Sequence, residues 1–326
     1  MQDLLVPLQE ALHLANRSNE FDRYLAQFKA ANPDAKGIEV VEFESAKNSY
    51  FNQNYAKAID QFSRYVVSYP ESPRLTEAKY YEAESYYRMN DYVKSLEIHQ
   101  QISGDVTFSL ITKAISRIAE LEFKQGHFEK AVPAFQKLNA LATNKKEQYA
   151  AWNGLMESYF LLAQYDSADV FARKILEQGS INASAQNKAA LYLGKDAMAR
   201  GDYETAKDEF LTTLNTARDE YGAEAKYQLA EIFFLSKDYK QCKETLFALN
   251  NDFAAYEDWV GKSYLLLADN FMAMGESFQA KGTLKSLIEN FPKQSIKDLA
   301  KEKLKVIEEA ERKQKAATEK SDSTGN

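Results

Sequence analysis

A ten-residue stretch, Gly201 to Phe210, contains a pattern that recurs along most of the chain. It places tyrosine, alanine and phenylalanine at positions 203, 206 and 210. The first of these positions is filled, in chain order, by Tyr55, Tyr92, Phe128, Tyr165, Tyr203, Tyr239 and Ser277. The six intervals are 37, 36, 37, 38, 36 and 38 residues. So regular an interval predicts one repeat array rather than two ordinary domains.

The second and third positions of the pattern are also regular. The small position reads Ala58, Ser95, Ala131, Ala168, Ala206, Cys242 and Ala280. The position four residues later reads Phe62, His99, Phe135, Ala172, Phe210, Leu246 and Leu284. Because residues three and four apart share one face of a helix, the pattern predicts a helix whose small residue faces a neighbouring helix.

A second helical pattern precedes each of these. In the fourth repeat it is formed by Trp152, Leu155, Met156 and Tyr159, at i, i+3, i+4 and i+7. The corresponding stripe of the third repeat contains one charged residue, Glu122. With only 12 glycines and 6 prolines in 326 residues, the composition also favours helix throughout. The predicted fold class is all-α.

A short turn is expected between the two helices of each repeat. Glycine occupies it at Gly126, Gly201 and Gly275, where a left-handed conformation would end the first helix. The other repeats place Gln53, Asn90, Ala163 and Lys237 at the same position.

The same patterns define the expected domain organisation. Residues 1–38 are expected to form a degenerate N-terminal repeat, and residues 39–294 seven regular repeats. Residues 295–317 are expected to form a capping helix, because Ile296, Leu299, Ala300, Leu304 and Ile307 make one apolar stripe that would cover the last repeat. Residues 318–326 are polar, lack aromatic residues and are expected to be disordered.

The repeat resembles the tetratricopeptide repeat. The resemblance is carried by Trp152, Leu155 and Tyr159 in the fourth repeat, by Leu193, Gly194, Gly201, Tyr203, Ala206 and Phe210 in the fifth, and by Tyr55, Ala58, Phe62 and Pro70 in the first. It implies a right-handed superhelical solenoid of antiparallel helix pairs that acts as a non-catalytic protein interaction scaffold. In this family the first helices line a concave groove that binds a partner segment.

A narrower resemblance concerns the ends of two second helices. Tyr69-Pro70-Glu71-Ser72 and Phe291-Pro292-Lys293 are similar to the bacterial cell-envelope branch of the family, which includes the Tol-Pal-associated coordinator and the outer-membrane-assembly lipoprotein. This resemblance implies a periplasmic location if the chain is a fragment or mature form, whereas a true start at Met1 implies the cytoplasm. The alternative function is therefore a C-terminal regulatory or sensor part of a larger multidomain cell-envelope protein.

The resemblance also indicates which residues would line the groove. One line of first-helix residues is apolar throughout: Tyr50, Tyr87, Phe123, Phe160, Met198, Phe234 and Met272. Three residues earlier, the row is mostly acidic, with Glu84, Glu120, Glu157, Glu231 and Asp269 beside Lys47 and Lys195. We expect a protein or peptide partner of basic amphipathic character. The alternative is that the apolar line widens the core and the acidic row is a solvated surface.

Composition and motifs argue against other classes of function. The formal net charge is -7 and no basic cluster precedes the tail, so a nucleic-acid partner is not expected. No apolar run is long enough for membrane insertion. His13, His99 and His127 lie in separate repeats, and no catalytic, metal-binding or phosphate-binding motif occurs. We therefore expect no enzyme activity, no metal or cofactor, and no small-molecule substrate.

Overall fold

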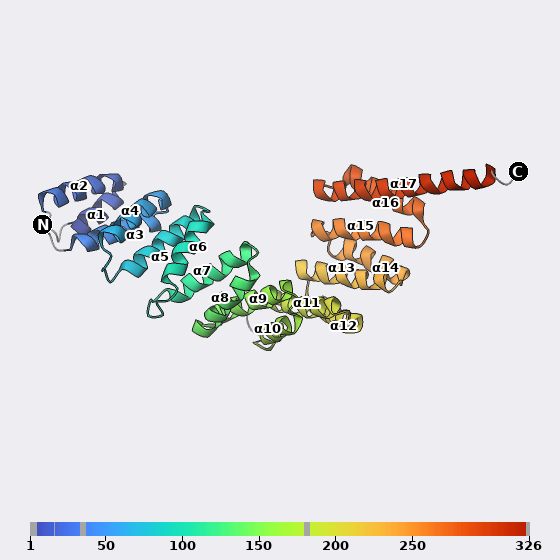
Figure 1. The fold of residues 1–326 in the computed structure, drawn as a ribbon, viewed down its shortest axis with the longest axis horizontal. Helices are drawn as coiled ribbons and strands as arrows, with labels where there is room; N and C mark the ends of the chain where they lie inside the picture. Colours follow the sequence, from blue (N-terminus) through green and yellow to red (C-terminus); the bar gives the residue numbers. More distant parts are fainter. Residues whose placement is uncertain (1–4, 16, 33–36, 179–182, 324–326) are drawn as a thin grey trace. The chain divides into compact units, whose positions relative to one another are not determined.

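The computed structural model describes residues 5–15, 17–32, 37–178 and 183–323. Within these ranges the chain forms seventeen α-helices and no β-strand (Figure 1), so the predicted all-α class is confirmed. The helices are α1 (Leu5–Leu14), α2 (Ser18–Ala31), α3 (Ile38–Phe51), α4 (Tyr55–Ser68), α5 (Leu75–Arg88), α6 (Tyr92–Ile102), α7 (Ile111–Lys124), α8 (Phe128–Leu141), α9 (Lys145–Leu161), α10 (Tyr165–Gln178), α11 (Ala183–Ala199), α12 (Tyr203–Thr216), α13 (Glu220–Leu235), α14 (Tyr239–Asp252), α15 (Glu257–Ala273), α16 (Ser277–Asn290) and α17 (Gln294–Ser323).

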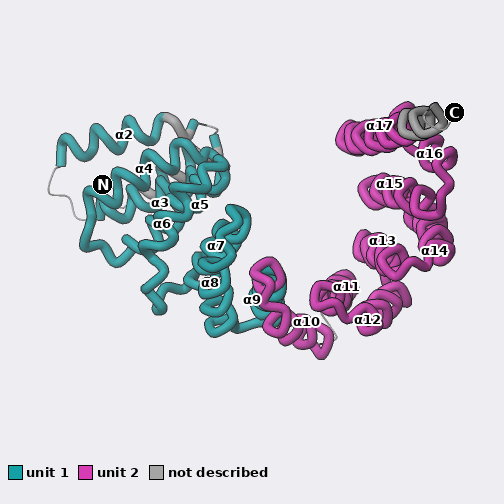
Figure 2. The backbone as a smooth tube through the Cα atoms, turned by 45° about the vertical axis from the view of Figure 1, so that its right-hand side comes forward, with its two compact units in different colours: residues 1–158 teal, residues 159–326 magenta. Residues whose placement is uncertain are grey.

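The chain divides into two compact units, residues 1–158 and residues 159–326 (Figure 2). In unit 1, consecutive helices pack against each other in five pairs, from α3 with α4 to α7 with α8. In unit 2, consecutive helices pack in the same way, from α10 with α11 to α16 with α17. The sequence predicted one array, and the structure divides it into two units. Both have the organisation of a repeat array, in which a helix pair contacts its neighbours rather than a single central core.

The small position of the repeat and the position four residues later are buried. The side chains of Ala58, Ser95, Ala131, Ala168, Ala206, Cys242 and Ala280 have no exposed surface. The residues four positions later are buried in all seven repeats, and Phe62 and Phe210 are among the largest side chains without exposed surface. These two positions supply the face of each second helix that packs against the first helices.

Polar caps fix the start of several second helices. The side chains of Asn54, Asp91, Asp202 and Asp238 each accept a hydrogen bond from a backbone N–H in the first turn of the helix that follows. Such a cap satisfies one of the N–H groups that a helix leaves without a partner at its N-terminus. The aromatic residue of the repeat pattern is therefore the first residue of each of these helices.

The turn before each cap contains a left-handed residue, as predicted. Gly126, Gly201 and Gly275 have φ values of 77°, 80° and 78°. The non-glycine residues at the same position, Gln53, Asn90, Ala163 and Lys237, have φ values of 61°, 63°, 56° and 61°. All seven repeats thus end the first helix in the same way, and four of them do so with a residue other than glycine, of which Asn90 tolerates this conformation best.

We expect Lys237→Gly to raise the stability of the protein. A side chain in the left-handed region costs about 1–2 kcal/mol, and the greater freedom of glycine in the unfolded chain offsets about 0.5–1 kcal/mol of the gain. The net gain of about 0.5–1 kcal/mol can be measured by urea denaturation. Gly201→Ala is the reverse control, because its added Cβ would meet no atom within 4 Å, and it should be less stable than wild type. A stabilised Gly201→Ala would contradict the explanation.

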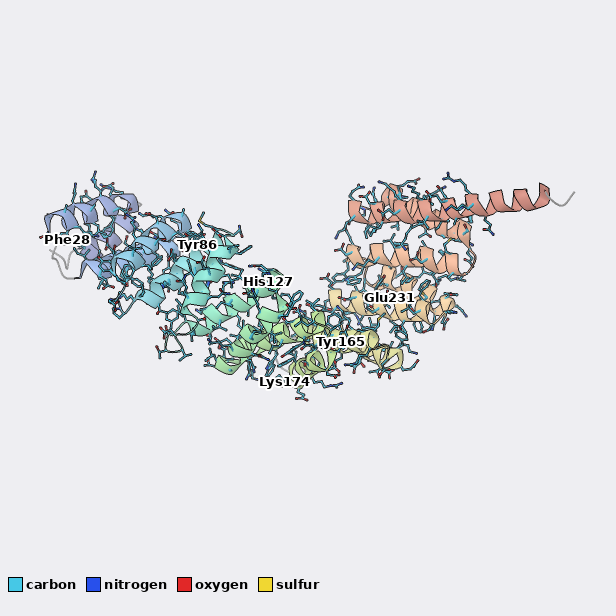
Figure 3. The ribbon with its side chains drawn as sticks, in the orientation of Figure 1. Phe28, Tyr86, His127, Tyr165, Lys174 and Glu231 are labelled. Atoms are coloured by element: carbon cyan, nitrogen blue, oxygen red, sulfur yellow. The ribbon has the colours of Figure 1, made fainter. Side chains whose placement is uncertain are left out.

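Glu122, the charged residue in an apolar stripe, is buried with polar partners. Its side chain is 3% exposed. Its Oε1 accepts a hydrogen bond of 3.0 Å from the side-chain amide of Gln100, and its Oε2 lies 2.9 Å from Nδ1 of His127. These contacts offset the cost of burying the carboxylate. His127, which lies in the turn after α7 (Figure 3), therefore contacts this buried acid.

The first helix pair has its own small core. Leu5, Leu12, Phe21 and Leu25 are buried together with Val41 of α3, and Tyr24 and Phe28 pack against them. Residues 1–4 and 33–36 lie outside the described residues, so both ends of the predicted N-terminal segment are only partly covered.

The last helix is longer than predicted. Ile296 and Ala300 of α17 are buried against Leu265, Ala268 and Leu284, so α17 covers the last repeat. Leu299, however, is 47% exposed and does not belong to this contact. The helix continues to Ser323, which corrects the predicted end at 317, because the segment contains good helix formers and no glycine or proline before residue 325. Residues 324–326 of the predicted disordered tail lie outside the described residues.

Candidate functional site

The seven residues of the predicted apolar line are all half-buried. Five of them contact the first residue of the following second helix, with ring centroids 5.3–5.9 Å apart: Tyr50 with Tyr55, Tyr87 with Tyr92, Phe123 with Phe128, Phe160 with Tyr165 and Phe234 with Tyr239. Met198 and Met272 pack against buried residues of unit 2. Much of this apolar surface therefore closes the turn inside each repeat, as the core-widening alternative expects.

The predicted acidic row lies beside this line and pairs with neighbouring helices. Glu84 of α5 binds Arg117 of α7, and Asp269 of α15 binds Lys303 of α17 at 2.7 Å. The two lysines of the row do the same, because Lys47 binds Glu77 of α5 and Lys195 binds Glu224 of α13, both at 2.9 Å. Four members of this row therefore pair with the next first helix or, for Asp269, with the last helix α17.

The other acidic residues have different surroundings. Glu120 binds Arg117 and Lys124. Glu157 accepts a hydrogen bond of 2.6 Å from the side chain of Asn153. Glu231 lies on α13 (Figure 3). Burial raises the pKa of its carboxyl group, and the positive charge of Lys262, which lowers this pKa, only partly offsets the effect.

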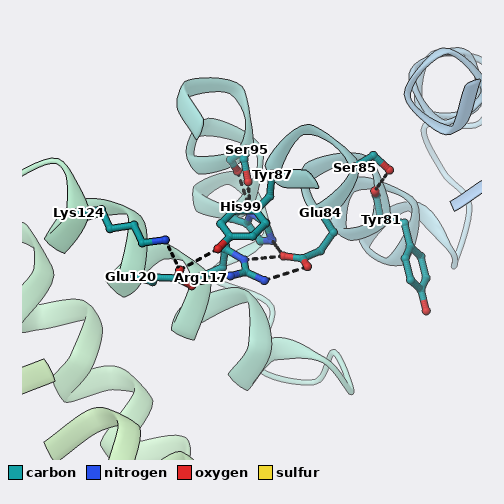
Figure 4. Close-up of polar contacts among 9 residues, drawn as sticks. All are labelled: Tyr81, Glu84, Ser85, Tyr87, Ser95, His99, Arg117, Glu120 and Lys124. Carbon is teal, nitrogen blue, oxygen red and sulfur yellow. Dashed lines mark hydrogen bonds and ion pairs between the residues drawn. The ribbon is translucent and has the colours of Figure 1, made fainter. Parts of the chain in front are cut away.

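A cluster of charged residues in unit 1 surrounds Glu84 (Figure 4), a residue that is only 5% exposed. Arg117 donates to both of its oxygens, from Nε at 2.8 Å and from Nη2 at 3.1 Å. Nε2 of His99 lies 3.4 Å from Oε1. Burial alone would raise the pKa of Glu84, but the contacts with His99 and Arg117 outweigh it and lower this pKa to about 2. Glu84 is therefore an ionised residue inside the packed repeats.

The same arginine holds a second carboxylate. Nη1 of Arg117 lies 2.5 Å from Oε2 of Glu120, and the guanidinium carbon lies 3.5 Å from the centroid of the Tyr87 ring. The Tyr87 hydroxyl donates to Glu120 at 2.8 Å, and Lys124 binds the same carboxylate at 2.8 Å. Three predicted site residues, Tyr87, Glu84 and Glu120, thus converge on an arginine that the sequence analysis did not single out.

His99 replaces the usual apolar residue of a second helix. Its side chain has no exposed surface, and its ring packs edge-on against Tyr80. Nδ1 lies 2.8 Å from the backbone oxygen of Ser95, so Nδ1 is the donor, and Nε2 faces Glu84. This histidine is a packing residue, and its Nε2 can donate to the buried acid only when both ring nitrogens carry a proton.

Three exposed apolar residues lie one position beyond the predicted line. At this position Phe51 is 60% exposed, Leu161 is 49% exposed and Leu235 is 50% exposed. They lie at the C-terminal ends of first helices, where the side chain points away from the repeat core. The sequence carried a signal for them, because three of the seven repeats place a large apolar residue directly after the line.

Two segments of the sequence, residues 45–72 and 262–293, match the family described as tetratricopeptide repeat. The chain contains tetratricopeptide repeats. Both segments begin in a first helix and end beyond the second helix, at the prolines that the sequence analysis had noted. The narrower resemblance to cell-envelope members of the family is not confirmed by these matches.

Solved structures support the tetratricopeptide fold. A tetratricopeptide repeat protein from Parabacteroides merdae ATCC 43184 is 16% identical, with a TM-score of 0.54 over 82% of this chain and 98% of that one. The C-terminal part of a repeat-containing protein from Cytophaga hutchinsonii is 16% identical, with a TM-score of 0.56 over 79% and 98%. A signal transduction ATPase with a tetratricopeptide repeat sensor from Pyrococcus horikoshii is 14% identical, with a TM-score of 0.58 over 95% and 50%.

These likenesses show the fold alone, because the identities are low. A search of curated proteins gives no match. Among the described residues of the tetratricopeptide array, no three or more His, Cys, Asp or Glu side chains are grouped so that they could hold a metal ion. Within the same part of the chain, no helix combines the length and the apolar character needed to cross a membrane.

Proposed function

We propose that this chain is a non-catalytic scaffold that binds a segment of a partner protein along the first helices of its tetratricopeptide repeats. Repeat arrays of this kind present extended surfaces that suit such partners. The observation that carries the proposal is the set of exposed apolar residues at the ends of first helices, Phe51, Leu161 and Leu235. Each adjoins a half-buried aromatic residue of the predicted line.

In unit 1 the proposed contact is centred on Phe51. Its ring lies 5.7 Å from that of Tyr81, and the Tyr50 ring lies 5.0 Å from Tyr81. The ammonium group of Lys47 lies 5.5 Å from the same tyrosine. Tyr81 is buried and Phe51 is exposed, so Phe51 is the accessible edge of a rigid aromatic cluster. Rigid aromatic side chains give large contact area at small cost in conformational entropy.

In unit 2 the proposed contact uses Leu161 and Leu235, which follow Phe160 and Phe234. The ring of Phe160 is held against Tyr192, with centroids 5.3 Å apart, and Lys195 lies 5.1 Å from the Phe160 ring. The predicted preference for a basic amphipathic partner rested on carboxylates such as Asp269, several of which are engaged within the array. The present proposal rests on the apolar residues instead.

The test uses peptides selected from a random library against the full chain. We expect Phe51→Ala, or Leu235→Ala for peptides bound to unit 2, to weaken the selected peptides at least tenfold, because truncating a residue that anchors an interface removes about 2 kcal/mol or more of binding energy. Isothermal titration calorimetry measures the dissociation constants. Both residues are half or more exposed, so the fold should be kept.

The matched control is Leu211→Ala. Leu211 is 49% exposed but lies on α12, a second helix, outside the proposed surface. It should leave peptide affinity unchanged. If the selected peptides bind all three variants as tightly as wild type, the first helices are not the binding surface.

The alternative function, a regulatory or sensor part of a larger cell-envelope protein, stays a prediction. The observation that favours a sensor role is the likeness to the Pyrococcus horikoshii protein, of which this chain covers only 50%. A change in peptide affinity or hydrogen exchange on adding a candidate signal would support that role.

A further inference from the structure

Asp196 is a carboxylic acid in a part of the array where the other repeats have neutral residues. Its side chain, on α11, has no exposed surface. The equivalent positions in other first helices hold the buried residues Ser85, Leu121, Ser158, Ile232 and Asn270. Among the described residues, no hydrogen-bond donor reaches either of its oxygens. An isolated ionised carboxylate in such a place would be strongly unfavourable.

The neighbouring acid is Asp169 of α10. Oδ1 of Asp169 and both oxygens of Asp196 are buried without a donor among the described residues. The neighbouring Asp169 carboxyl group raises the pKa of Asp196, and a hydrogen bond between two carboxyl groups requires that one of them carry a proton. Oδ2 of Asp169 accepts a hydrogen bond of 3.0 Å from Arg200, whereas no donor outside the pair reaches Oδ1 among the described residues. Arg200 also binds Asp166 at 3.2 Å. The hydrogen bond from Arg200 thus goes to Asp169, and Asp196 is the member of the pair whose pKa is raised.

The remaining charges near the pair come from three helices. Lys195 and Arg200, at the end of α11, oppose protonation of Asp196, but Lys195 is engaged with Glu224 of α13. On α12, Glu209 adds negative charge toward Asp169. Burial and the charge of Asp169 outweigh the two cations, so the pKa of Asp196 is raised well above its usual range.

We propose that Asp169 and Asp196 share one proton, and that loss of this proton at alkaline pH loosens the packing of α10 against α11. The pair therefore makes this part of unit 2 responsive to pH. Because the folded protein holds the proton more tightly than the unfolded chain does, the stabilisation is complete below the pKa of an unfolded aspartate. It is lost as the pH rises through the raised pKa of the folded state.

Hydrogen exchange of the full chain between pH 5 and pH 9 tests the proposal. The protection factors of α10 and α11 should fall with rising pH, by at most tenfold per pH unit if one opening releases one proton. Those of α3 and α4 in unit 1, which contain no histidine, should not follow this profile. Asp196→Asn puts in place the residue that α15 has at the equivalent position, Asn270, and should remove the fall. The exposed Asp208→Asn on α12 should behave as wild type.

A second variant keeps the test decisive. Asp169→Asn removes the neighbouring negative charge but leaves Asp196 buried, so the fall in protection should move to lower pH, and the proposal can be judged even if Asp196→Asn folds poorly. A wild-type profile that is flat across this range would overturn the proposal. So would a fall at the same pH and of equal steepness in wild type and in the folded variants, because the titrating group would then lie elsewhere.

Discussion

Arg117→Met is expected to lower the free energy of unfolding by about 3–5 kcal/mol, because it leaves the buried carboxylate of Glu84 without its main partner. The methionine replaces the volume of the arginine stem, so the loss reports the missing charge and hydrogen bonds rather than a cavity. Urea denaturation of the full chain at pH 7 measures it. Lys113→Met, an exposed site on the same helix α7, is the matched control and should change the stability by less than about 0.5 kcal/mol.

The pH dependence provides a second signature of the same pair. In wild type the folded pKa of Glu84 is lowered to about 2, so its contribution to stability is present above the pKa of an unfolded glutamate and is lost as the pH falls toward 2. In Arg117→Met the buried Glu84 has lost its main partner, and protonation removes the cost of burying its charge. The loss in free energy of unfolding relative to wild type should therefore be smaller at pH 4 than at pH 7. Adding Glu84→Gln should recover most of the loss at pH 7. If the loss of stability in Arg117→Met does not depend on pH, or is no larger than that in Lys113→Met, the pair of Glu84 and Arg117 is not important for stability.

The repeat pattern made the architecture accessible from the sequence. A residue such as Ala206 can be assigned to a helix contact because seven positions with the same spacing carry small residues. The left-handed turn could be located at Lys237, where no glycine marks it, because the position is fixed by its distance from the aromatic residue. Periodicity therefore predicts local geometry even where a single repeat has an unusual residue.

The same periodicity could not assign partners between helices. Glu84 and Arg117 are 33 residues apart, slightly less than one repeat, and the other pairs between first helices have similar separations. The sequence shows that charges occupy this row, but which of them pair depends on how far one first helix is shifted along the next. The sequence therefore predicts that the acidic row is a surface for a partner. In the structure, three of its carboxylates, those of Glu84, Glu120 and Asp269, bind basic side chains within the array.

The buried acid Asp196 had a weak signal in the sequence. Its position can be aligned with Ser158 and Asn270, which are neutral, but one unusual residue in a repeat does not reveal burial by itself. Only the packing of α10 against α11 brings Asp169 beside it. Sites of this kind follow from contacts between neighbouring helices, which the pattern within one helix does not contain.

Gly194→Ala is expected to destabilise the protein, although the same exchange inside a helix usually stabilises. A Cβ at position 194 of α11 would lie 2.5 Å from Cε1 of Phe210, whose side chain has no exposed surface. Overpacking of this kind costs about 1–3 kcal/mol, whereas replacing a mid-helix glycine gains about 0.5–1 kcal/mol. Gly282→Ala on α16 is the matched control, because its Cβ would meet no atom within 4 Å, and it should raise the stability.

A double-mutant cycle separates the steric term from helix propensity. The next repeat pairs Ala230 with Leu246, both without exposed surface, where this repeat pairs Gly194 with Phe210. Phe210→Leu should therefore make room for the new methyl group. In that background Gly194→Ala is expected to stabilise by about 0.5–1 kcal/mol, so that the sign of its effect reverses. Urea denaturation of the four proteins gives the coupling energy. If Gly194→Ala has the same effect in both backgrounds, the glycine is not needed to accommodate the phenylalanine, and the spacing of α11 and α12 is set by other contacts.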